Sequence, residues 1–255
     1  MEISNRFSLK GKVAIITGAS KGIGASIAFA LSEYGAKVVV SSRKQDAVDK
    51  VAQRITDTGG DAIGIACNTG NMKDLENLVE KTISHFGAID ILVNNAATNP
   101  VFGPVLHTDE SAYDKIMNVN VKGPFQLSKL AHPEMVKRGG GVIINISSIG
   151  GISPENMLGI YSVSKAALIS LTKVLAKEWG KDGIRVNVIC PGLIKTKFSE
   201  PLWNNDKIRN IMMKQLPIAK VGEPDEIAAL ALFLASEASS YSTGGVFTAD
   251  GGYTI

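Results

Sequence analysis

Cysteine and histidine are scarce in this sequence, and neither is arranged for a disulfide framework or a metal. Cys67 and Cys190 are the only cysteines, and both fall near the ends of apolar segments expected to be buried strands. We therefore expect both cysteines to be free thiols that pack as small apolar side chains in a reducing compartment. His85, His107 and His132 are isolated, without the spacing of metal ligands. We therefore expect no disulfide and no metal site.

Strong charge imbalance and long apolar runs are also lacking. The formal net charge is +3, and the Lys and Arg residues are scattered without interleaved aromatic residues, so we expect no nucleic-acid partner. No uninterrupted apolar run approaches the roughly 18 residues that a membrane span needs. Residues 1–10 are polar rather than signal-like, and residues 252–255 match no targeting tripeptide. These absences predict a cytoplasmic protein with no membrane partner.

Short apolar segments alternate with longer helical patterns along the chain. Strands are expected at Val13–Thr17, Lys37–Ser41, Ala62–Ala66, Ile89–Val93, Gly141–Ile146, Arg185–Ile189 and Val246–Thr248. Helices are expected at Ile23–Tyr34, Gln45–Thr56, Met72–His85, Glu110–Lys137, Ile160–Trp179 and Glu226–Ala235. The alternation predicts one α/β domain over residues 1–255, with a parallel sheet covered on both faces. Residues 193–217 interrupt the last crossover and are expected to form a substrate lid.

A glycine-rich turn follows the first strand. Gly18, Gly22 and Gly24 lie in the run Thr17-Gly-Ala-Ser-Lys-Gly-Ile-Gly, just before a helical pattern. A strand, a glycine turn and a helix N-terminus in that order form a phosphate cradle. Gly18 permits the tight turn, Gly22 lets the backbone approach a pyrophosphate, and Gly24 allows close packing of helix on strand.

Candidate catalytic residues lie near the middle of the chain. Tyr161 follows Ser148 by thirteen residues, and Lys165 follows Tyr161 by four. The four-residue step places Tyr161 and Lys165 on one helix face, where the ammonium should lower the pKa of the phenol. Such a phenol can exchange a proton with a carbonyl or alcohol oxygen, which the Ser148 hydroxyl could hold.

Polar residues also follow other strand ends, where ligands bind in doubly wound sheets. With the motifs above, the runs Asn94-Asn95-Ala96 and Pro191-Gly192 make the chain from Lys10 to Gly252 resemble the short-chain dehydrogenase/reductase family. The resemblance implies a Rossmann-type doubly wound sheet of strand order 3-2-1-4-5-6-7. It also implies a homotetramer whose dimer contact pairs the helices Glu110–Lys137 and Ile160–Trp179.

The resemblance assigns roles to several residues. It makes Tyr161 the general acid/base and Ser148, rather than its rival Ser147, the residue that orients the substrate oxygen. Lys165 would bind the nicotinamide ribose, Asn120 (with Asn118 as the competing choice) would anchor a proton-relay water, and Thr196 would bond the nicotinamide carboxamide. The full set of cofactor residues implied is Gly18, Ser20, Lys21, Gly22, Ile23, Gly24, Ser42, Arg43, Asn68, Asn94, Tyr161, Lys165, Pro191, Gly192, Ile194 and Thr196.

Two positions depart from the family pattern. Ala97 stands where the family often has glycine, which is a mild change. Asn68 stands where many members have an aspartate facing the adenine, and an asparagine can keep that contact because it both accepts and donates.

The choice between NADP and NAD follows from charge. Enzymes that use NAD place a carboxylate after the second strand, whereas this chain has Ser42 and Arg43 there, with no acid before Asp46. Arg43 can pair with a 2′-phosphate, and Lys21 in the glycine turn adds a second cation. NADP(H) is therefore the expected cofactor, and NAD is the less favoured one.

The substrate is expected to be a hydrophobic ketone or aldehyde. Mostly apolar residues form the expected pocket wall: Phe102, Ile149, Leu158, Leu193, Phe198, Leu202 and Trp203. Residues 99–103 and 191–196 also resemble NADPH-dependent carbonyl reductases. A 3-oxoacyl-[acyl-carrier-protein] reductase is the alternative within the family. An NADP(H)-sensing protein without turnover is the alternative of another class, against which the retention of Ser148, Tyr161 and Lys165 argues.

Overall fold

The structure is a computed structural model that describes residues 2–255, apart from the side chains of residues 207 and 208; the first residue of the expected domain lies outside this range. A seven-stranded parallel sheet forms its centre, in the order β3-β2-β1-β4-β5-β6-β7. The strands are β1 Val13–Thr17, β2 Lys37–Ser42, β3 Asp61–Ala66, β4 Ile91–Asn94, β5 Gly141–Ile146, β6 Ile184–Pro191 and β7 Val246–Ala249. The expected fold class, strand order and number of strands are confirmed.

Five strands have ends that differ from the prediction: β2, β3 and β7 are each one residue longer, and β4 and β6 differ at both ends. β4 begins at Ile91 rather than Ile89, and just before it the Asp90 carboxylate accepts the Val13 N–H at 2.9 Å. β6 continues to Pro191, since Cys190 and Pro191 still pair with β7. The longer β6 delivers the Pro191-Gly192 turn directly to the carboxyl edge of the sheet.

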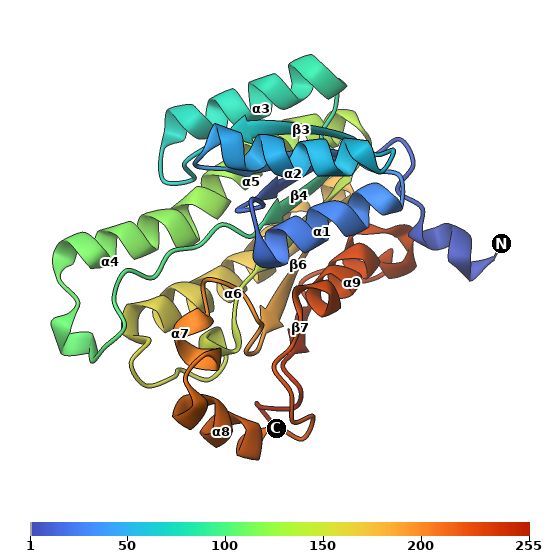
Figure 1. Ribbon diagram of the computed structural model, residues 1–255. Coiled ribbons are helices and arrows are strands. Elements are labelled where there is room, and N and C mark those ends of the chain that lie inside the picture. Colours follow the sequence, from blue (N-terminus) through green and yellow to red (C-terminus); the bar gives the residue numbers. More distant parts are fainter. Residues whose placement is uncertain (1) are drawn as a thin grey trace.

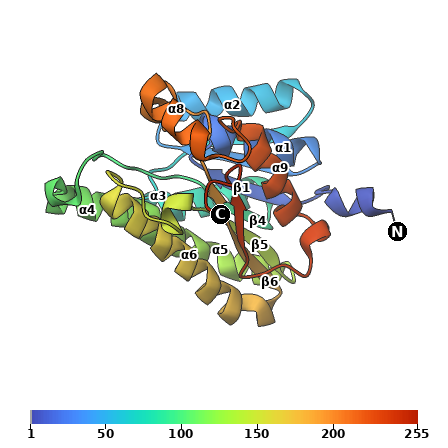
Figure 2. The same cartoon turned by 90° about the horizontal axis from the view of Figure 1, so that it is seen from below.

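Helices cover both faces of the sheet (Figures 1 and 2). They are α1 Gly22–Glu33, α2 Gln45–Asp57, α3 Met72–Phe86, α4 Glu110–Met117, α5 Gly123–Lys137, α6 Gly159–Trp179, α7 Glu200–Trp203, α8 Asp206–Gln215 and α9 Pro224–Ala235. On one face, α1, α2 and α9 bury side chains such as Ile27, Val48 and Ile227 against the sheet. On the other, α3, α5 and α6 bury Leu78 and Leu127 among their neighbours.

The helix expected at Glu110–Lys137 is continuous, but it is not a regular α-helix throughout. A π-helical turn at Asn118–Lys122 joins α4 to α5. Pro124 explains the change of helix type, because it has no N–H to donate to the carbonyl of Asn120 and its ring crowds that carbonyl. The π turn therefore changes which side chains of this segment face the sheet edge.

Helix α6 is the one described helix that is long and apolar enough, with the turn that follows it, to cross a membrane by length and composition alone. Half of this span is buried inside the protein, where α6 packs on β6. A core helix of a folded domain has the same composition, and the expectation of no membrane partner stays a prediction.

The 193–217 segment leaves the sheet at the end of β6 and folds into α7 and α8 (Figure 1). Its start is anchored by backbone bonds from the Lys195 N–H to the Gly222 carbonyl (2.8 Å) and from the Gly222 N–H to the Leu193 carbonyl (3.0 Å). The segment therefore projects from a fixed base beside the carboxyl ends of the strands.

Candidate active site

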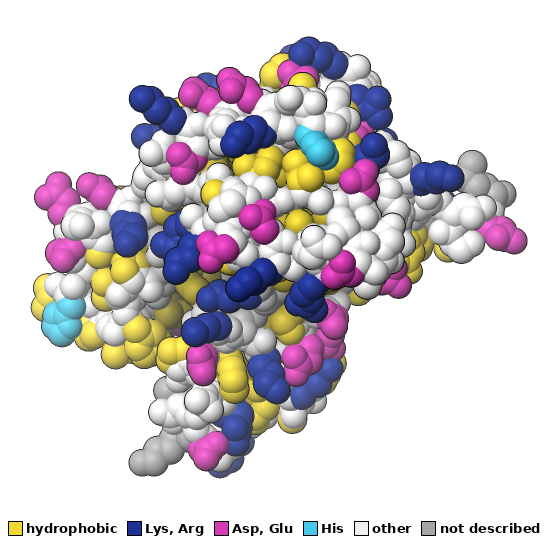
Figure 3. All heavy atoms as spheres, turned by 45° about the horizontal axis from the view of Figure 1, so that its top comes forward, with side chains coloured by type: hydrophobic (Ala, Val, Ile, Leu, Met, Phe, Trp, Pro, Cys, Tyr) yellow, Lys and Arg dark blue, Asp and Glu magenta, His cyan; other side chains and the backbone are white. Residues whose placement is uncertain are grey.

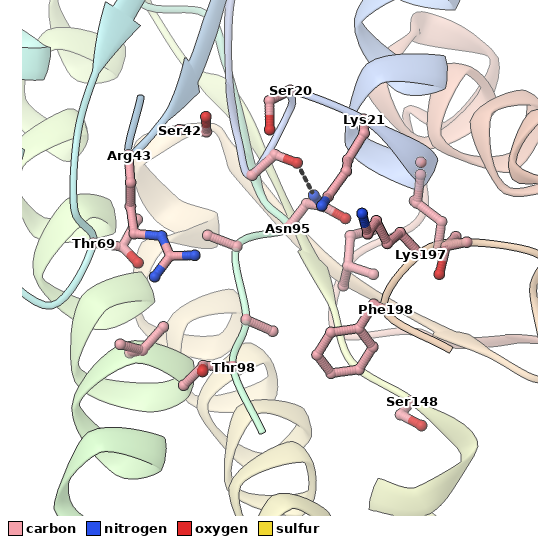
Figure 4. Close-up of a pocket in the computed structure, with 18 of the residues that line it drawn as sticks. Ser20, Lys21, Ser42, Arg43, Thr69, Asn95, Thr98, Ser148, Lys197 and Phe198 are labelled. Carbon is pink, nitrogen blue, oxygen red and sulfur yellow. Dashed lines mark hydrogen bonds between the residues drawn. The ribbon is translucent and has the colours of Figure 1, made fainter. Parts of the chain in front are cut away.

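A cavity of about 1020 Å³ opens at the carboxyl edge of the sheet. The glycine turn, the ends of β2, β3, β4 and β5, helix α6 and the start of the 193–217 segment all contribute to its wall (Figure 4). The predicted site residues that line it are Gly18, Ser20, Lys21, Gly22, Ile23, Ser42, Arg43, Asn68, Ser148, Tyr161, Lys165, Pro191, Ile194, Thr196 and Phe198. Segments far apart in the sequence thus meet around one space.

The glycine turn is shaped by backbone conformations that favour glycine. Gly18 has φ +66° and Gly22 has φ +57°. The Asn95 side chain fixes the turn by donating to the carbonyls of Thr17 (2.9 Å) and Gly18 (3.1 Å). A Cβ at Gly24 would lie 2.5 Å from Asn95 Nδ2, so Gly24 permits this close packing rather than lining the cavity. The N-terminal amides of α1 therefore lie at the cavity wall, where an anion is favoured.

Tyr161 and Lys165 lie on α6 as the spacing predicted. Both are buried, at 8% and 2% exposure, and Lys165 Nζ lies 5.6 Å from the centre of the Tyr161 ring. The ammonium donates to the carbonyl of Ile146 at the end of β5, at 2.8 Å. This bond fixes the lysine between the sheet and the tyrosine.

The geometry distinguishes Ser148 from Ser147. Ser147 Oγ donates to the Lys165 carbonyl at 2.8 Å, which ties β5 to α6. Ser148 Oγ accepts the Gly150 N–H at 3.1 Å and forms a side-chain hydrogen bond with Tyr161. Ser148 is thus the serine whose hydroxyl interacts with the phenol, which agrees with the choice made from the spacing.

The expected lowering of the tyrosine pKa is wrong for this structure. Burial raises the pKa of Tyr161 to about 12, and the hydrogen bond with Ser148 offsets only part of that rise. Burial also lowers the pKa of Lys165 to about 8. The sequence spacing places the ammonium beside the phenol, but the loss of solvation of the phenolate sets the direction of the pKa shift.

Asn120 is completely buried and does not line the cavity. Its Oδ1 accepts the Thr98 N–H (2.8 Å), and its Nδ2 donates to the Thr98 carbonyl (3.0 Å) and to Ser164 Oγ (3.0 Å). Asn118, the competing choice, does line the cavity and donates to the Gly70 carbonyl at 2.8 Å. The side chain of Asn120 therefore holds the loop after β4, and its predicted part in a proton relay stays a prediction.

Two other predicted cofactor residues lie outside the cavity wall. Asn94 is buried in the sheet, where its Nδ2 donates to Asn145 Oδ1 (2.9 Å) and Ser128 Oγ (3.2 Å). Gly192 packs on the segment after β7, since a Cβ there would lie 2.7 Å from Asp250 Cα. Asn94 and Gly192 therefore pack inside the protein next to the strand ends, while their sequence neighbours Asn95 and Pro191 line the cavity.

One of the predicted apolar wall residues lines this cavity. Phe198 lies 5.9 Å from the Tyr161 ring, centre to centre. Trp203 Nε1 donates to the Thr196 carbonyl at 2.9 Å. The predicted residues that do not line the cavity are Phe102, Ile149, Leu158, Leu193, Leu202 and Trp203. Their part in a substrate pocket stays a prediction.

Several lining residues were not found from the sequence. They are Lys44, Ala47, Cys67, Thr69, Gly70, Ala97, Thr98, Lys115, Val119, Ile146, Lys197 and Ser199, besides the motif members Asn95, Ala96, Asn118 and Ser147. Most of these residues follow a strand end or neighbour a predicted residue. Their position at the strand ends was therefore the sequence signal that could have identified them. Lys115 had no such signal beyond its charge.

The charge of the cavity wall has one sign. Lys21, Arg43, Lys44, Lys115, Lys165 and Lys197 line it, and no Asp or Glu does so among the described residues. Figure 3 shows Lys and Arg side chains gathered near the middle of one face, between the lobe of α4 and the lobe of α8. Within residues 2–255, no group of His, Cys, Asp and Glu side chains could hold a metal ion. The site fits an anionic organic ligand.

Comparison with known proteins defines the family. A family model described as Enoyl-(Acyl carrier protein) reductase matches residues 18–254. The protein is similar to Dehydrogenase/reductase SDR family member 4 of Sus scrofa, with 44% identity over 98% of this chain and 90% of the relative. The chain belongs to the short-chain dehydrogenase/reductase (SDR) family and is an oxidoreductase of that family.

Solved structures agree with this assignment. A short-chain type dehydrogenase/reductase from Mycobacterium marinum is 37% identical, with a TM-score of 0.94 over 100% of both chains. A 7α-hydroxysteroid dehydrogenase complexed with NADH and 7-oxo glycochenodeoxycholic acid is 38% identical, with a TM-score of 0.95 over 99% of this chain and 98% of that one. A gluconate 5-dehydrogenase from Burkholderia cenocepacia in complex with NADP and tartrate is 31% identical, with a TM-score of 0.95 over 99% of each chain. Similar proteins thus include complexes with either dinucleotide.

Proposed function

We propose that this protein is an NADP(H)-dependent carbonyl reductase that converts a ketone or aldehyde of a hydrophobic small molecule to the alcohol, and catalyses the reverse reaction. The observation that carries the proposal is the meeting of Ser148, Tyr161 and Lys165 with the glycine turn around one cavity. The bound dinucleotide would supply or accept the hydride.

The chain's own residues would polarise the substrate oxygen. The raised pKa of Tyr161 keeps the phenol protonated at neutral pH, so it can donate a hydrogen bond and then a proton to a carbonyl oxygen during reduction. Ser148 would donate a second hydrogen bond to that oxygen, where negative charge grows in the transition state. Lys165, held by the Ile146 carbonyl, would place its ammonium beside the phenol and bind ribose hydroxyls.

The charge of the cavity supports NADP(H) over NAD(H). Arg43 and Lys21 line it, and Figure 4 shows the Arg43 guanidinium directed into it. Arg43 forms no ion pair with any residue that the structure describes, and no carboxylate of the described residues lines the wall to bond a free ribose 2′-hydroxyl. A 2′-phosphate would supply the missing counter-charge.

Two observations support a hydrophobic carbonyl substrate. Phe198 beside Tyr161 gives the reacting end one apolar wall, and the similar 7α-hydroxysteroid dehydrogenase was solved with 7-oxo glycochenodeoxycholic acid. An acyl-carrier thioester, as in a 3-oxoacyl-[acyl-carrier-protein] reductase, is the second candidate, because the matching family model, Enoyl-(Acyl carrier protein) reductase, is also named for an acyl-carrier substrate. In either case residues 193–217 would act as the substrate lid.

A homotetramer is part of the same proposal. The helices expected to pair, α4 with α5 and α6, leave apolar side chains on the surface, among them Tyr113, Phe125, Val163 and Val174. Contact between two copies would bury them. Light scattering with size-exclusion chromatography tests the assembly.

The function is tested by following NADPH oxidation with a panel of hydrophobic ketones and aldehydes, and with an acetoacetyl thioester. Turnover of the ketones over the thioester supports the proposal. Preference for the thioester would favour the second candidate, a 3-oxoacyl-[acyl-carrier-protein] reductase. Tight NADPH binding with no turnover of any substrate would contradict both and favour a nucleotide sensor.

A further inference from the structure

The start of the 193–217 segment touches the glycine turn. A Cβ at Gly22 would lie only 3.1 Å from Thr196 Cγ2, so the Thr196 side chain packs directly on the Gly22 backbone. Lys21 precedes Gly22, and Lys197 follows Thr196. A cation from each segment therefore flanks the contact.

Lys21 and Lys197 lie on the wall of two adjoining spaces. Both line the main cavity, and both line a second groove of about 920 Å³ that runs between α1, α2 and the start of α9. Figure 4 shows the two lysines entering from different elements, with their amino ends directed toward the same region near Asn95. The boundary between the two spaces is thus marked by two positive charges.

Glu200, Glu223 and Asp225 line the second groove, but none of them forms an ion pair with Lys197. Lys195 pairs with Glu223 at 3.9 Å and lies over the Trp203 ring. Lys197 forms no ion pair with any residue that the structure describes. Placing two unpaired ammonium groups at one contact is unfavourable unless an anion lies between or beside them.

We propose that Lys197 is a phosphate-binding residue of the dinucleotide site, and that with Lys21 it binds the diphosphate and holds the 193–217 segment against the glycine turn. The inference rests on the proposed function, because it assumes a dinucleotide in this cavity. Its consequence is that nucleotide binding orders the segment before substrate arrives, so the wall that carries Phe198 is completed by the cofactor.

Binding measurements test the proposal without turnover. Lys197→Gln removes the charge, and Lys214→Gln makes the same charge change in the same segment outside both spaces. We expect Lys197→Gln to weaken NADPH and 2′-phospho-ADP-ribose binding about tenfold, the scale of one partly exposed charge-assisted hydrogen bond, and to leave 2′-AMP binding unchanged. Lys214→Gln should bind all three ligands as the wild type does.

Amide hydrogen exchange gives a second readout. NADP should slow exchange over residues 193–206 in the wild type and in Lys214→Gln, and should slow it less in Lys197→Gln. Equal affinities for the wild type and Lys197→Gln, or an equal loss for 2′-AMP, would overturn the inference while leaving the proposed function standing. If the wild type binds no dinucleotide, the inference and the proposed function both fail.

Discussion

The buried ammonium of Lys165 predicts an unusual dependence of stability on pH. Its pKa lies at about 8 in the folded protein, against the ordinary value of 10.5, because burial penalises the charged form. Between these values the unfolded chain holds a proton that the folded chain has lost. Stability conferred by this group therefore increases as pH rises from about 8 to 10.5.

The size of the effect follows from the same two values. Their difference corresponds to about 3 kcal/mol in the free energy of unfolding. Tyr161 acts in the opposite direction above its ordinary value, since its pKa is raised from 10.0 to about 12. Cys67 and Cys190 do the same above pH 9, because burial raises their pKa values from 9.0 to about 12 and about 11. The lysine contribution is therefore measured as a difference between the wild type and a variant that lacks the ammonium.

Urea unfolding of the nucleotide-free protein, followed by tryptophan fluorescence, measures the effect. The free energy of unfolding of the wild type minus that of Lys165→Met should rise by about 2 to 3 kcal/mol between about pH 7.5 and pH 10, while contributions of other groups cancel. A Tyr161→Phe background should show the same rise. A difference that stays flat or falls with pH would refute the claim that burial lowers the pKa of Lys165 in the folded protein.

Three further substitutions test the site. Arg43→Asp should raise the KM for NADPH about a hundredfold and change that for NADH far less, because it replaces a phosphate partner by a repelling carboxylate; Lys50→Asp on α2 controls for net charge, and equal changes for both dinucleotides would remove the argument. Tyr161→Phe should abolish turnover at nearly unchanged NADPH affinity, and residual turnover near the wild-type rate would exclude the phenol as the proton donor. Gly18→Ala should lower the free energy of unfolding by about 1 to 3 kcal/mol, measured by urea titration, because its Cβ would lie 2.8 Å from Asn95 Nδ2 at a φ of +66°; wild-type stability would contradict that account.

The sheet and the residues at its edge were predictable because their signals are local. Apolar strands such as Val13–Thr17 and the helix-face spacing of Tyr161 and Lys165 depend on period alone, and both are found in the structure. The continuous helix over Glu110–Lys137 was predictable from its apolar pattern, and Pro124 was the local signal for the π turn at Asn118–Lys122 that the pattern did not reveal.

Features that depend on distant contacts were not predictable. Asn94 follows a strand end like Asn95, yet only the packing of β5 and α5 turns its side chain into the sheet. The direction of the Tyr161 pKa depends on how deeply α6 is buried, which the spacing of two residues does not contain. The wall around Phe198 depends on how the 193–217 segment folds, and its amphipathic pattern fits several orientations.

The accumulation of positive charge connects these observations. A cavity wall with lysines and arginine and no described carboxylate brings like charges together in the ligand-free protein, and their mutual repulsion has a cost in free energy. An anionic ligand removes part of that cost, so its binding energy includes relief of repulsion as well as new hydrogen bonds. The proposed choice of NADP(H) follows from the same charges, because a carboxylate that would accept the 2′-hydroxyl of NAD would also have neutralised Arg43. The proposed affinity for a phosphorylated dinucleotide is therefore a consequence of charge, whereas the lowered pKa of Lys165 is a consequence of burial.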